Sequence, residues 1–272
     1  MSAMQQPTAN TDGELREAIA TLGLGTPPTD SSAKGAESIA SSLEHFLDLM
    51  LRWNRVYNLT AITDRAQMIT HHLVDSLAIV PTLDGLLAGQ TQPRLLDVGT
   101  GAGLPGIALA VARPHWQLTL VDSNSKKTAF VTQAVAELGL TNVDVDTGRV
   151  EQQRSIQPRN QQSNQARNQQ SNQARNPQSI QARHQQRIQP RNQPQSIQHD
   201  VIVSRAFASL GDFVSGTRHL LAHDGTWVAM KGVVPHAEIE ALPNDVECAA
   251  IVPLDVPGLD AERHLILMKA KR

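Results

Sequence analysis

Short apolar runs and amphipathic segments alternate along the chain from Arg94 onward, and this alternation predicts the fold. A continuous apolar run indicates a buried parallel strand, whereas apolar positions that recur every three or four residues indicate a helix. Up to residue 150 the predicted elements are strands over 94–98, 117–121 and 142–146, with helices over 104–112 and 124–138 between them. They form a right-handed β-α-β-α-β unit, which is one half of a doubly wound α/β sheet.

The second half of the sheet is predicted from Asp200 to the end of the chain. Its elements are a strand over 200–207, a helix over 210–221, a strand over 225–232 and two strands near 245–253 and 263–269. We expect the last two strands to pair in antiparallel fashion at the edge and to close the sheet.

Helices are predicted ahead of the first strand. Apolar residues recur at intervals of three and four from Ala36 to Tyr57, which predicts an amphipathic helix. A second helix is predicted over 64–80, ending before Pro81. The organisation expected from these elements is a flexible tail and linker over 1–35 with one short helix at 13–24, an N-terminal helical segment over 36–92, and an α/β domain over 93–272.

A low-complexity insert over 152–199 separates the two halves of the predicted sheet. Residues 157–197 repeat with a period of eight, beginning QPRNQQSN and QARNQQSN. A segment with so few apolar residues cannot bury a core, so the insert is expected to be disordered. Because loop-closure entropy grows only logarithmically with length, ~40 added residues are expected to cost the fold about 1–2 kcal/mol. Neutral expansion and weak attraction of RNA by the arginines are the two interpretations of the repeat.

A glycine-rich turn, GTGAGLPG, joins the first strand to the following helix at residues 99–106. Glycine allows the backbone to turn sharply and a ligand to approach closely, and the helix that follows presents free N–H groups to that ligand. Residues 101–106 also fit the dinucleotide fingerprint, so the turn alone does not separate NAD from S-adenosylmethionine.

Two carboxylates near this turn carry more information about the ligand. Asp97, two residues before Gly99, is placed to meet the cationic methionine end of S-adenosylmethionine, which favours this cofactor over NAD. Asp122, at the end of the next strand, is placed to accept the ribose hydroxyls of an adenosine, which suits both cofactors. The alternative role of Asp122 is an N-cap for the following helix. A hydride-transfer enzyme is disfavoured because the chain has no separate substrate domain with the histidine or tyrosine that such chemistry uses.

Composition excludes several other classes of protein. The chain has 272 residues, of which 40% are hydrophobic, and its apolar stretches are too short to span a bilayer, so a cytoplasmic location is expected. The one cysteine, Cys248, excludes a disulfide framework and disfavours cysteine-dependent methylation of pyrimidine carbon. No metal is expected, because no HExxH or paired CxxC motif occurs and the neighbours His71 and His72 cannot share one helical face. One of these histidines is interpreted as a core or surface residue and the other as a candidate substrate contact.

Charge is distributed unevenly along the chain. The formal net charge is −2, but residues 152–199 contain seven arginines and no acidic residue, so the remainder carries −9. A surface for nucleic acid must therefore be a local basic patch. Arg52 and Arg55, near the end of the helix over 36–57, are candidates for such a patch, and compensation of the helix dipole explains them equally well.

Eight stretches match one family in the same order along the chain. They are RWNRVYNLTAIT (52–63), HHLVDSL (71–77), LLDVGTGAGLPGIALA (95–110), VDS (121–123), GRVE (148–151), VIVSRAFASL (201–210), MKG (230–232) and ERHL (262–265). Together they resemble the bacterial small-subunit ribosomal RNA guanine-N7 methyltransferases, the glucose-inhibited division protein B family. The resemblance spans about residues 36–270 and departs from the family at the insert and at Ala102, where many members carry proline.

The resemblance implies a Rossmann-like class I S-adenosylmethionine methyltransferase sheet with N-terminal helices. It also implies which residues bind the cofactor, namely Gly99, Gly101 and Leu104 in the turn, Asp122, Val150, Glu151 and Arg205. We expect Arg205 to bridge cofactor and substrate as the catalytic residue, with Phe207 lining the base pocket. A salt bridge from Arg205 to a carboxylate such as Glu151 is the alternative. Lys231, Arg52 and Arg55 are candidate contacts to RNA phosphates.

The implied activity is methylation of guanine N7 in 16S ribosomal RNA, with that RNA or the small ribosomal subunit as partner and a monomeric enzyme. Methyltransferases that act on exocyclic amines commonly carry an Asp/Asn-Pro-Pro-aromatic loop, and this chain has SRAFAS (204–209) in that place. Guanine N7 has a lone pair and no proton, so alignment of the reactants without a general base is sufficient. The alternatives are a methyltransferase for a small molecule or another RNA, and a non-catalytic RNA-binding or ribosome-assembly factor that retains the cofactor fold.

Overall fold

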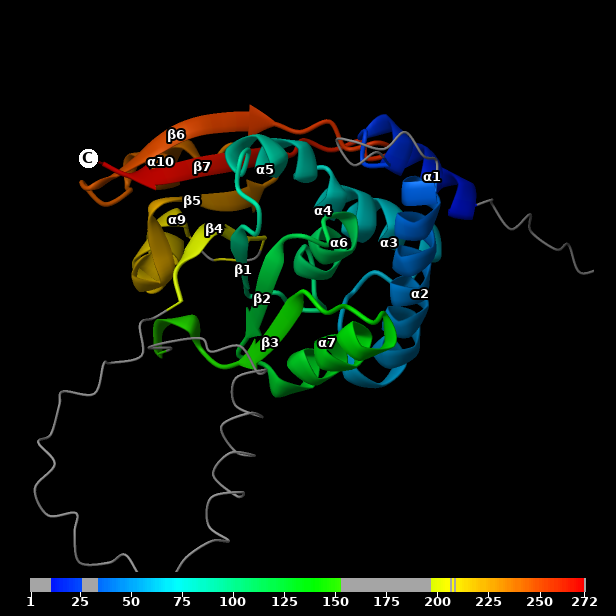
Figure 1. Cartoon of the computed structure of the whole chain (residues 1–272). Helices are drawn as coiled ribbons and strands as arrows, with labels where there is room; N and C mark the ends of the chain where they lie inside the picture. Colours follow the sequence, from blue (N-terminus) through cyan, green and yellow to red (C-terminus); the bar gives the residue numbers. More distant parts are fainter. Residues whose placement is uncertain (1–10, 26–33, 153–196, 206, 208, 272) are drawn as a thin grey trace, which may run out of the picture. The chain divides into compact units, whose positions relative to one another are not determined.

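A seven-stranded mixed sheet runs through the part of the chain that this computed structural model describes, which is residues 11–25, 34–152, 197–205, 207 and 209–271. The strand order is β3-β2-β1-β4-β5-β7-β6 (Figure 1). The strands are β1 (Arg94–Val98), β2 (Gln117–Asp122), β3 (Val143–Thr147), β4 (His199–Ser204), β5 (Leu221–Lys231), β6 (Val246–Pro253) and β7 (His264–Ala270).

The sheet has the predicted α/β architecture. Strands β1 to β5 are parallel to one another, and β7 pairs antiparallel with both β5 and β6 at one edge. Each predicted strand is present, although β4 ends at Ser204 and β5 begins at Leu221, four residues earlier than predicted. The register explains this second difference, because Leu221 pairs with His199 at the start of β4. The helix predicted over 210–221 is accordingly shorter and ends at Thr217.

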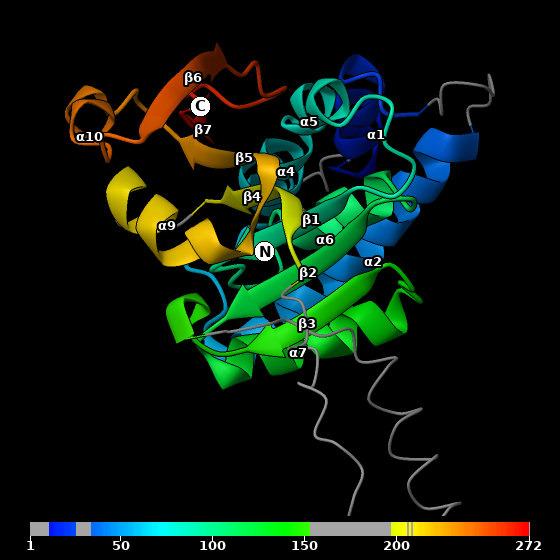
Figure 2. The same cartoon turned by 60° about the vertical axis from the view of Figure 1, so that its left-hand side comes forward.

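Helices cover both faces of the sheet (Figure 2). Helices α6 (Gly106–Ala112) and α7 (Ser125–Glu137) lie on one face, and α9 (Leu210–Thr217) lies on the other, followed by α10 (His236–Glu240). All residues of α6 are buried, because it lies between the sheet and the N-terminal helix α2 (Lys34–Tyr57). The pattern of small apolar residues in α6 reflects this close packing on two sides.

The N-terminal helix α2 packs through the predicted apolar stripe. The stripe residues Ile39, Leu43, Phe46, Leu47 and Met50 are buried. Phe46 and Trp53 of this helix both contact the Phe130 ring on α7, with centroids 5.9 and 5.6 Å apart. Helix α1 (Thr11–Thr21) packs on α2 in turn, so one hydrophobic core includes residues from the N-terminal helices and from the sheet.

The helix predicted over 64–80 has a different form. It consists of α3 (Arg65–Met68), a π-helical turn over Ile69–Val74 and α4 (Asp75–Leu77). Pro81 lies in the first turn of a further helix, α5 (Val80–Leu86), where its missing N–H group is not needed. The apolar pattern does not distinguish a widened turn from a regular one, because residues 72–80 are all buried and no single apolar face marks the helical period. The π-helical turn changes the direction of the side chains that follow, including Asp75.

Three predicted features fall partly or wholly on residues outside the description. Residues 1–10 and 26–33 of the predicted tail and linker, and residues 153–196 of the predicted insert, lie outside the described residues. No helix within the described part of the chain is long and apolar enough to cross a membrane.

Candidate cofactor and active site

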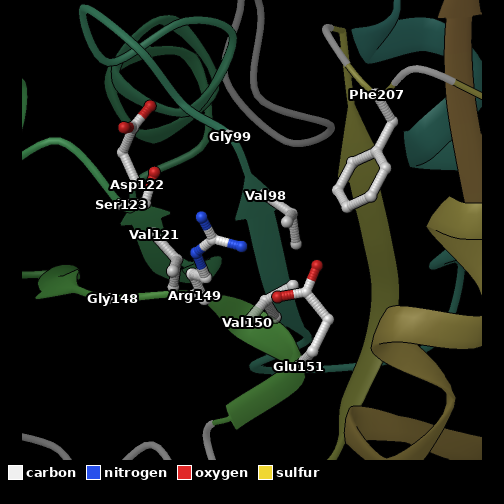
Figure 3. Close-up of a pocket in the computed structure, with 10 residues that line it drawn as sticks. All are labelled: Val98, Gly99, Val121, Asp122, Ser123, Gly148, Arg149, Val150, Glu151 and Phe207. Carbon is white, nitrogen blue, oxygen red and sulfur yellow. The ribbon is translucent and has the colours of Figure 1, made fainter.

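The carboxyl ends of the parallel strands meet at one edge of the sheet, where a cavity of about 240 Å³ opens (Figure 3). This is the edge at which open α/β sheets bind their ligands. The strands β1, β2, β3 and β4 each contribute to the cavity lining residues that lie at or just after their carboxyl ends. The lining residues are Val98, Gly99, Val121, Asp122, Ser123, Gly148, Arg149, Val150, Glu151 and Phe207.

A second hollow of about 710 Å³ shares Gly99, Glu151 and Phe207 with this cavity. Its other lining residues belong to α9 and the turn after it, namely Asp212, Ser215, Gly216 and His219. The two hollows together form a cleft that runs from the glycine turn towards α9. In Figure 3 Phe207 lies on the opposite side of the cavity from Asp122.

The glycine turn has the conformation that its sequence predicts. Gly99, Gly101 and Gly103 adopt φ values of 70°, 60° and 86°, a region that residues with a Cβ atom rarely occupy. A Cβ atom added at Gly99 would meet no atom within 4 Å, so the cavity is open to a ligand at this point. Leu104 is buried and its side chain is not among the lining residues.

Asp122 connects the second strand to this turn. Its Oδ2 atom accepts a hydrogen bond of 2.9 Å from the Gly101 N–H group, and its Oδ1 atom accepts one of 2.8 Å from Asn124. The N-cap of α7 is Asn124, so the alternative role of Asp122 as that cap is wrong. A carboxylate has about four acceptor positions, and the remaining ones are available to two ribose hydroxyls.

Asp97 is buried beneath the turn with only part of its hydrogen-bonding capacity used. Its Oδ2 atom accepts hydrogen bonds from Thr100 Oγ1 at 2.6 Å and from the Gly106 N–H group at 2.8 Å. Among the described residues its buried Oδ1 atom has no hydrogen-bond partner. Burial raises the pKa of Asp97 to about 6, against the lowering effect of those two hydrogen bonds. A buried carboxylate oxygen without a partner beside an open glycine turn fits the ammonium group of S-adenosylmethionine.

Gly106, the first residue of α6, is predicted to be required for the packing of this helix. A Cβ atom there would lie 2.6 Å from Leu120 Cγ and 2.8 Å from Asp97 Oδ2. Gly106→Ala should therefore displace the helix or the carboxylate and destabilise the protein by about 1–3 kcal/mol, as overpacking does. Chemical denaturation of Gly106→Ala and of the unmodified protein measures this difference in the free energy of unfolding.

The matched control for this substitution is Gly85→Ala in α5. A Cβ atom at Gly85 would meet no atom within 4 Å. Because alanine favours the helix interior by roughly 0.5–1 kcal/mol over glycine, Gly85→Ala should be neutral or stabilising. Equal free energies of unfolding for the two variants would contradict the packing role of Gly106.

Arg205 and Phe207 follow β4 and line a third, much smaller pocket together with Lys231 at the end of β5. The Arg205 Nη1 atom lies 3.6 Å from Asp75 Oδ2 and donates a hydrogen bond of 3.4 Å to the His71 carbonyl. The alternative prediction for Arg205, a salt bridge to a carboxylate, is therefore present in the structure, with Asp75 and not Glu151 as the partner. Phe207, whose ring contacts Phe213 at 5.3 Å between centroids, lines both this pocket and the larger cavity.

The other predicted RNA contacts differ in their surroundings. Lys231 is half-buried and its Nζ atom forms an ion pair with Glu238 at 3.1 Å. The Arg52 side chain is 63% exposed, and its Nη2 atom lies 4.0 Å from Glu137. Arg55 is exposed at the end of α2, beside the exposed Val56 and Tyr57. Arg52 and Arg55 are therefore accessible to a polyanion, whereas Lys231 is already paired.

Three side chains at this edge are absent from the predicted site. The Arg149 side chain projects among the cavity-lining residues in Figure 3. Asp75 and Arg263 pair at 2.8 Å next to Arg205. Arg149 lies in the GRVE stretch, between residues that the sequence does single out, so its position was a usable signal. The pairing of Asp75 with Arg263 has no such signal, because 188 positions separate them.

The sheet order, the glycine turn and the two carboxylates beside it define a Rossmann-like class I S-adenosylmethionine-dependent methyltransferase. Within the described residues, no group of three or more His, Cys, Asp or Glu side chains could hold a metal ion.

The family follows from comparison with known proteins. The chain matches the GidB family, described as rRNA small subunit methyltransferase G, over residues 39–166 and 169–266, and it belongs to this family. It is 42% identical over 257 residues to the ribosomal RNA small subunit methyltransferase G of Neisseria meningitidis serogroup A, covering 94% of this chain and 97% of that protein. The protein of the same name from Laribacter hongkongensis gives the same identity and coverage. The family predicted from the eight stretches is confirmed.

Proposed function

We propose that this protein transfers the methyl group of S-adenosylmethionine to N7 of a guanine in 16S ribosomal RNA. The observation that carries the proposal is the cavity at the carboxyl edge of the sheet, in a chain of the GidB family. It brings a glycine turn, the Asp122 carboxylate and the Val150–Glu151 segment to one side of Phe207. Ribosomal RNA is present in the cytoplasm, which is where we place the enzyme, as a monomer without a metal.

The residues of the cavity fit S-adenosylmethionine, which supplies an electrophilic methyl group when bound. Asp122 has acceptor capacity for the ribose hydroxyls. Val150 and Glu151 are placed against the adenosine, since they line the cavity beyond β3. The backbone at Gly99, Gly101 and Leu104 would bound the cofactor on the turn side, and Asp97 Oδ1, which has no partner among the described residues, would accept a hydrogen bond from its ammonium group.

The transfer to guanine N7 needs positioning rather than a base. The N7 lone pair forms the new bond to the methyl carbon while the carbon–sulfur bond breaks and its electron pair remains on sulfur. The purine takes up the positive charge and no proton is lost, so the site requires no general base. Phe207 supplies an aromatic surface for the purine, and Arg205 supplies hydrogen-bond donors between the two reactants.

Contact with the RNA backbone is assigned to the end of α2. Arg52 and Arg55 are exposed there on a protein whose charge outside the insert is −9. Tyr57, 42% exposed and in contact with the Trp53 ring at 5.2 Å, adds an aromatic surface to this basic end. Lys231 joins these phosphate contacts only after release from Glu238.

The proposal is tested by methyl transfer to small-subunit RNA from cells that lack this gene. Labelled S-adenosylmethionine is incubated with that RNA, as naked RNA and as assembled small subunits, and the modified nucleoside is identified by mass spectrometry. The full chain is compared with a version that lacks residues 157–197. We expect 7-methylguanosine from both versions.

The other outcomes distinguish the alternatives. Activity of the deletion version alone would make the repeat an inhibitory or regulatory segment, with the methylation assignment unchanged. A different methylated nucleoside would overturn the N7 assignment. No methylation by either version, although both bind the cofactor, would favour a ribosome-assembly factor without catalysis.

A further inference from the structure

Asp75 is a buried carboxylate held between two arginines that come from distant parts of the chain. Its side chain is 4% exposed and contacts Arg205 after β4 and Arg263 before β7. Asp75 itself begins α4 in the N-terminal helical segment. The three residues, which we call the Asp75 cluster, therefore join the N-terminal helices to two strand ends of the sheet.

The two contacts in the Asp75 cluster have different geometry. Arg263 Nε donates a hydrogen bond of 2.8 Å to Asp75 Oδ1, whereas Arg205 Nη1 lies 3.6 Å from Asp75 Oδ2. The short contact fixes the carboxylate, and the longer one orients Arg205 without saturating its donors. Among the described residues, the Arg205 guanidinium contacts Asp75 and the His71 carbonyl through Nη1, which leaves Nε and Nη2 for a ligand.

The charges in and around the Asp75 cluster leave Arg205 able to attract a ligand. Two guanidinium groups and one carboxylate give a net charge of +1 when their neighbours are neutral. His72, a titratable residue of the π-helical turn before Asp75, is buried and its Nε2 atom contacts Thr60 Oγ1 at 2.8 Å. Burial, helped by Arg205, lowers the pKa of His72 to about 4, so this histidine is neutral at physiological pH. His71, which is partly exposed, faces Arg205 through its carbonyl oxygen.

The π-helical turn places the carboxylate at this point. It covers Ile69–Val74 and ends directly before Asp75. Ser76 Oγ donates to the His72 carbonyl at 2.5 Å, which satisfies a backbone acceptor within the turn. A rigid, buried carboxylate next to a candidate catalytic arginine is an arrangement that fixes the arginine for one ligand geometry.

We propose that Asp75 is a positioning residue that holds Arg205 in the orientation needed for methyl transfer. This inference rests on the proposed role of Arg205 and assigns to Asp75 no contact with cofactor or RNA. Without the carboxylate, Arg205 would lose its anchor and would turn away from the reactants, while the cofactor site at Asp122 and the glycine turn would stay intact.

The test compares Asp75→Asn with a matched control, Asp84→Asn. Asp84 forms an ion pair with Arg113 through contacts of 2.8 and 2.5 Å, and this pair also joins the N-terminal helices to the sheet domain. It lies outside the cavities at the carboxyl edge of the sheet. Asp75→Asn weakens the ion pairs with Arg205 and Arg263, whereas Asp84→Asn weakens the single pair with Arg113. All three pairs join the N-terminal helices to the sheet domain, and only Asp75→Asn affects Arg205.

The measurements are kcat, KM for small-subunit RNA and binding of S-adenosylhomocysteine, with methyl incorporation counted on any nucleoside. We expect Asp75→Asn to lower kcat by on the order of 10–100-fold, as misplacement of a reactive geometry by about 1 Å does. Binding of S-adenosylhomocysteine should be unchanged, and Asp75→Glu should restore part of kcat because it keeps the charge. Asp84→Asn should retain the kcat of the unmodified enzyme.

A double-mutant cycle separates positioning from a structural role. If Asp75 acts through Arg205, adding Asp75→Asn to Arg205→Ala should lower kcat by less than about twofold further. A kcat of Asp75→Asn equal to that of Asp84→Asn, or additive losses in the double variant, would overturn the positioning role. Full activity of Arg205→Ala would instead overturn the role of Arg205 on which it rests. Failure of the unmodified enzyme to methylate RNA would overturn both.

Discussion

Replacing Arg205 with alanine is expected to slow methyl transfer to small-subunit RNA by on the order of 10²–10³-fold, the range for removal of one preorganised donor. Arg205 lies at the carboxyl end of β4 in the pocket that also contains Phe207, and its contacts with other described residues use only the Nη1 donor. The loss should appear in kcat, because an interaction that aligns the two reactants contributes mainly in the transition state.

The fold should survive this substitution. Asp75 keeps its shorter contact with Arg263, so removal of Arg205 does not leave a buried carboxylate without a partner. The thermal midpoint of Arg205→Ala should therefore stay within a few degrees of that of the unmodified protein, since about 1 kcal/mol corresponds to roughly 2–4 °C for a chain of this size.

The matched control is Arg218→Ala, which removes another half-exposed arginine after α9. Arg218 pairs with Asp245 and lies 5.9 Å from the centre of the Trp227 ring, away from the cavity. It should cost some stability and no activity per folded molecule. Arg205→Lys should be intermediate, because lysine keeps the charge and loses the planar set of donors. Activity of Arg205→Ala equal to that of Arg218→Ala would refute the catalytic assignment.

The sequence predicts those parts of the fold in which the local residue types directly reflect burial or backbone conformation. β1 reads as a continuous apolar run because it is covered on both faces, and the glycines after it are needed for positive φ values. Gly106, the last glycine of this turn, lies where α6 approaches β2. The burial of β1 and the positive φ values after it determine the local residue types, so both are visible in the sequence.

The parts that the sequence does not predict depend on pairs of residues far apart in the chain. Nothing near Asp75 indicates that it meets Arg205 and Arg263, because the fold brings them together only after the sheet has formed. The pairing of Lys231 with Glu238 depends on the position of α10 relative to β5, which the pattern does not fix. The charges of a site are thus visible in the sequence, whereas their partners are set by topology.

The second large effect is expected for Asp97→Asn, which should weaken binding of S-adenosylhomocysteine by on the order of 10–100-fold, the cost of about 1.4–3 kcal/mol for a charge-assisted hydrogen bond. S-adenosylhomocysteine carries the same ammonium group as the cofactor. In the unmodified protein this group would pair with the Oδ1 atom of Asp97, which has no partner among the described residues. Isothermal titration calorimetry at pH 7.5 measures the difference.

The same substitution should leave the ligand-free protein equally stable or make it more stable. A rise in the pKa of Asp97 from 3.8 to about 6 corresponds to an unfavourable contribution of about 3 kcal/mol above pH 6, at 1.36 kcal/mol for each unit of pKa. The folded state binds the proton more tightly, so this carboxyl group destabilises the protein progressively as the pH rises from 3.8 to 6. Asparagine avoids the cost of burying the charge, although it also changes the hydrogen bond with Thr100.

The pH dependence identifies the carboxyl group responsible. The depressed pKa values of His72 and His199, both about 4, make stability rise with pH between 4 and 6.5, but they are common to both proteins. The difference in free energy of unfolding between Asp97→Asn and the unmodified protein should therefore grow from pH 4 to pH 6 and then stay constant, as urea titrations at pH 4.5 and 7.5 would show.

Ligand affinity gives the complementary result, because the ammonium group needs the ionised carboxylate. In the unmodified protein affinity should fall about tenfold for each pH unit below 6, and in Asp97→Asn it should not change with pH in this range. Equal affinities of the two proteins at pH 7.5 would show that the ammonium group binds elsewhere and that Asp97 serves only to hold the turn through its Oδ2 atom.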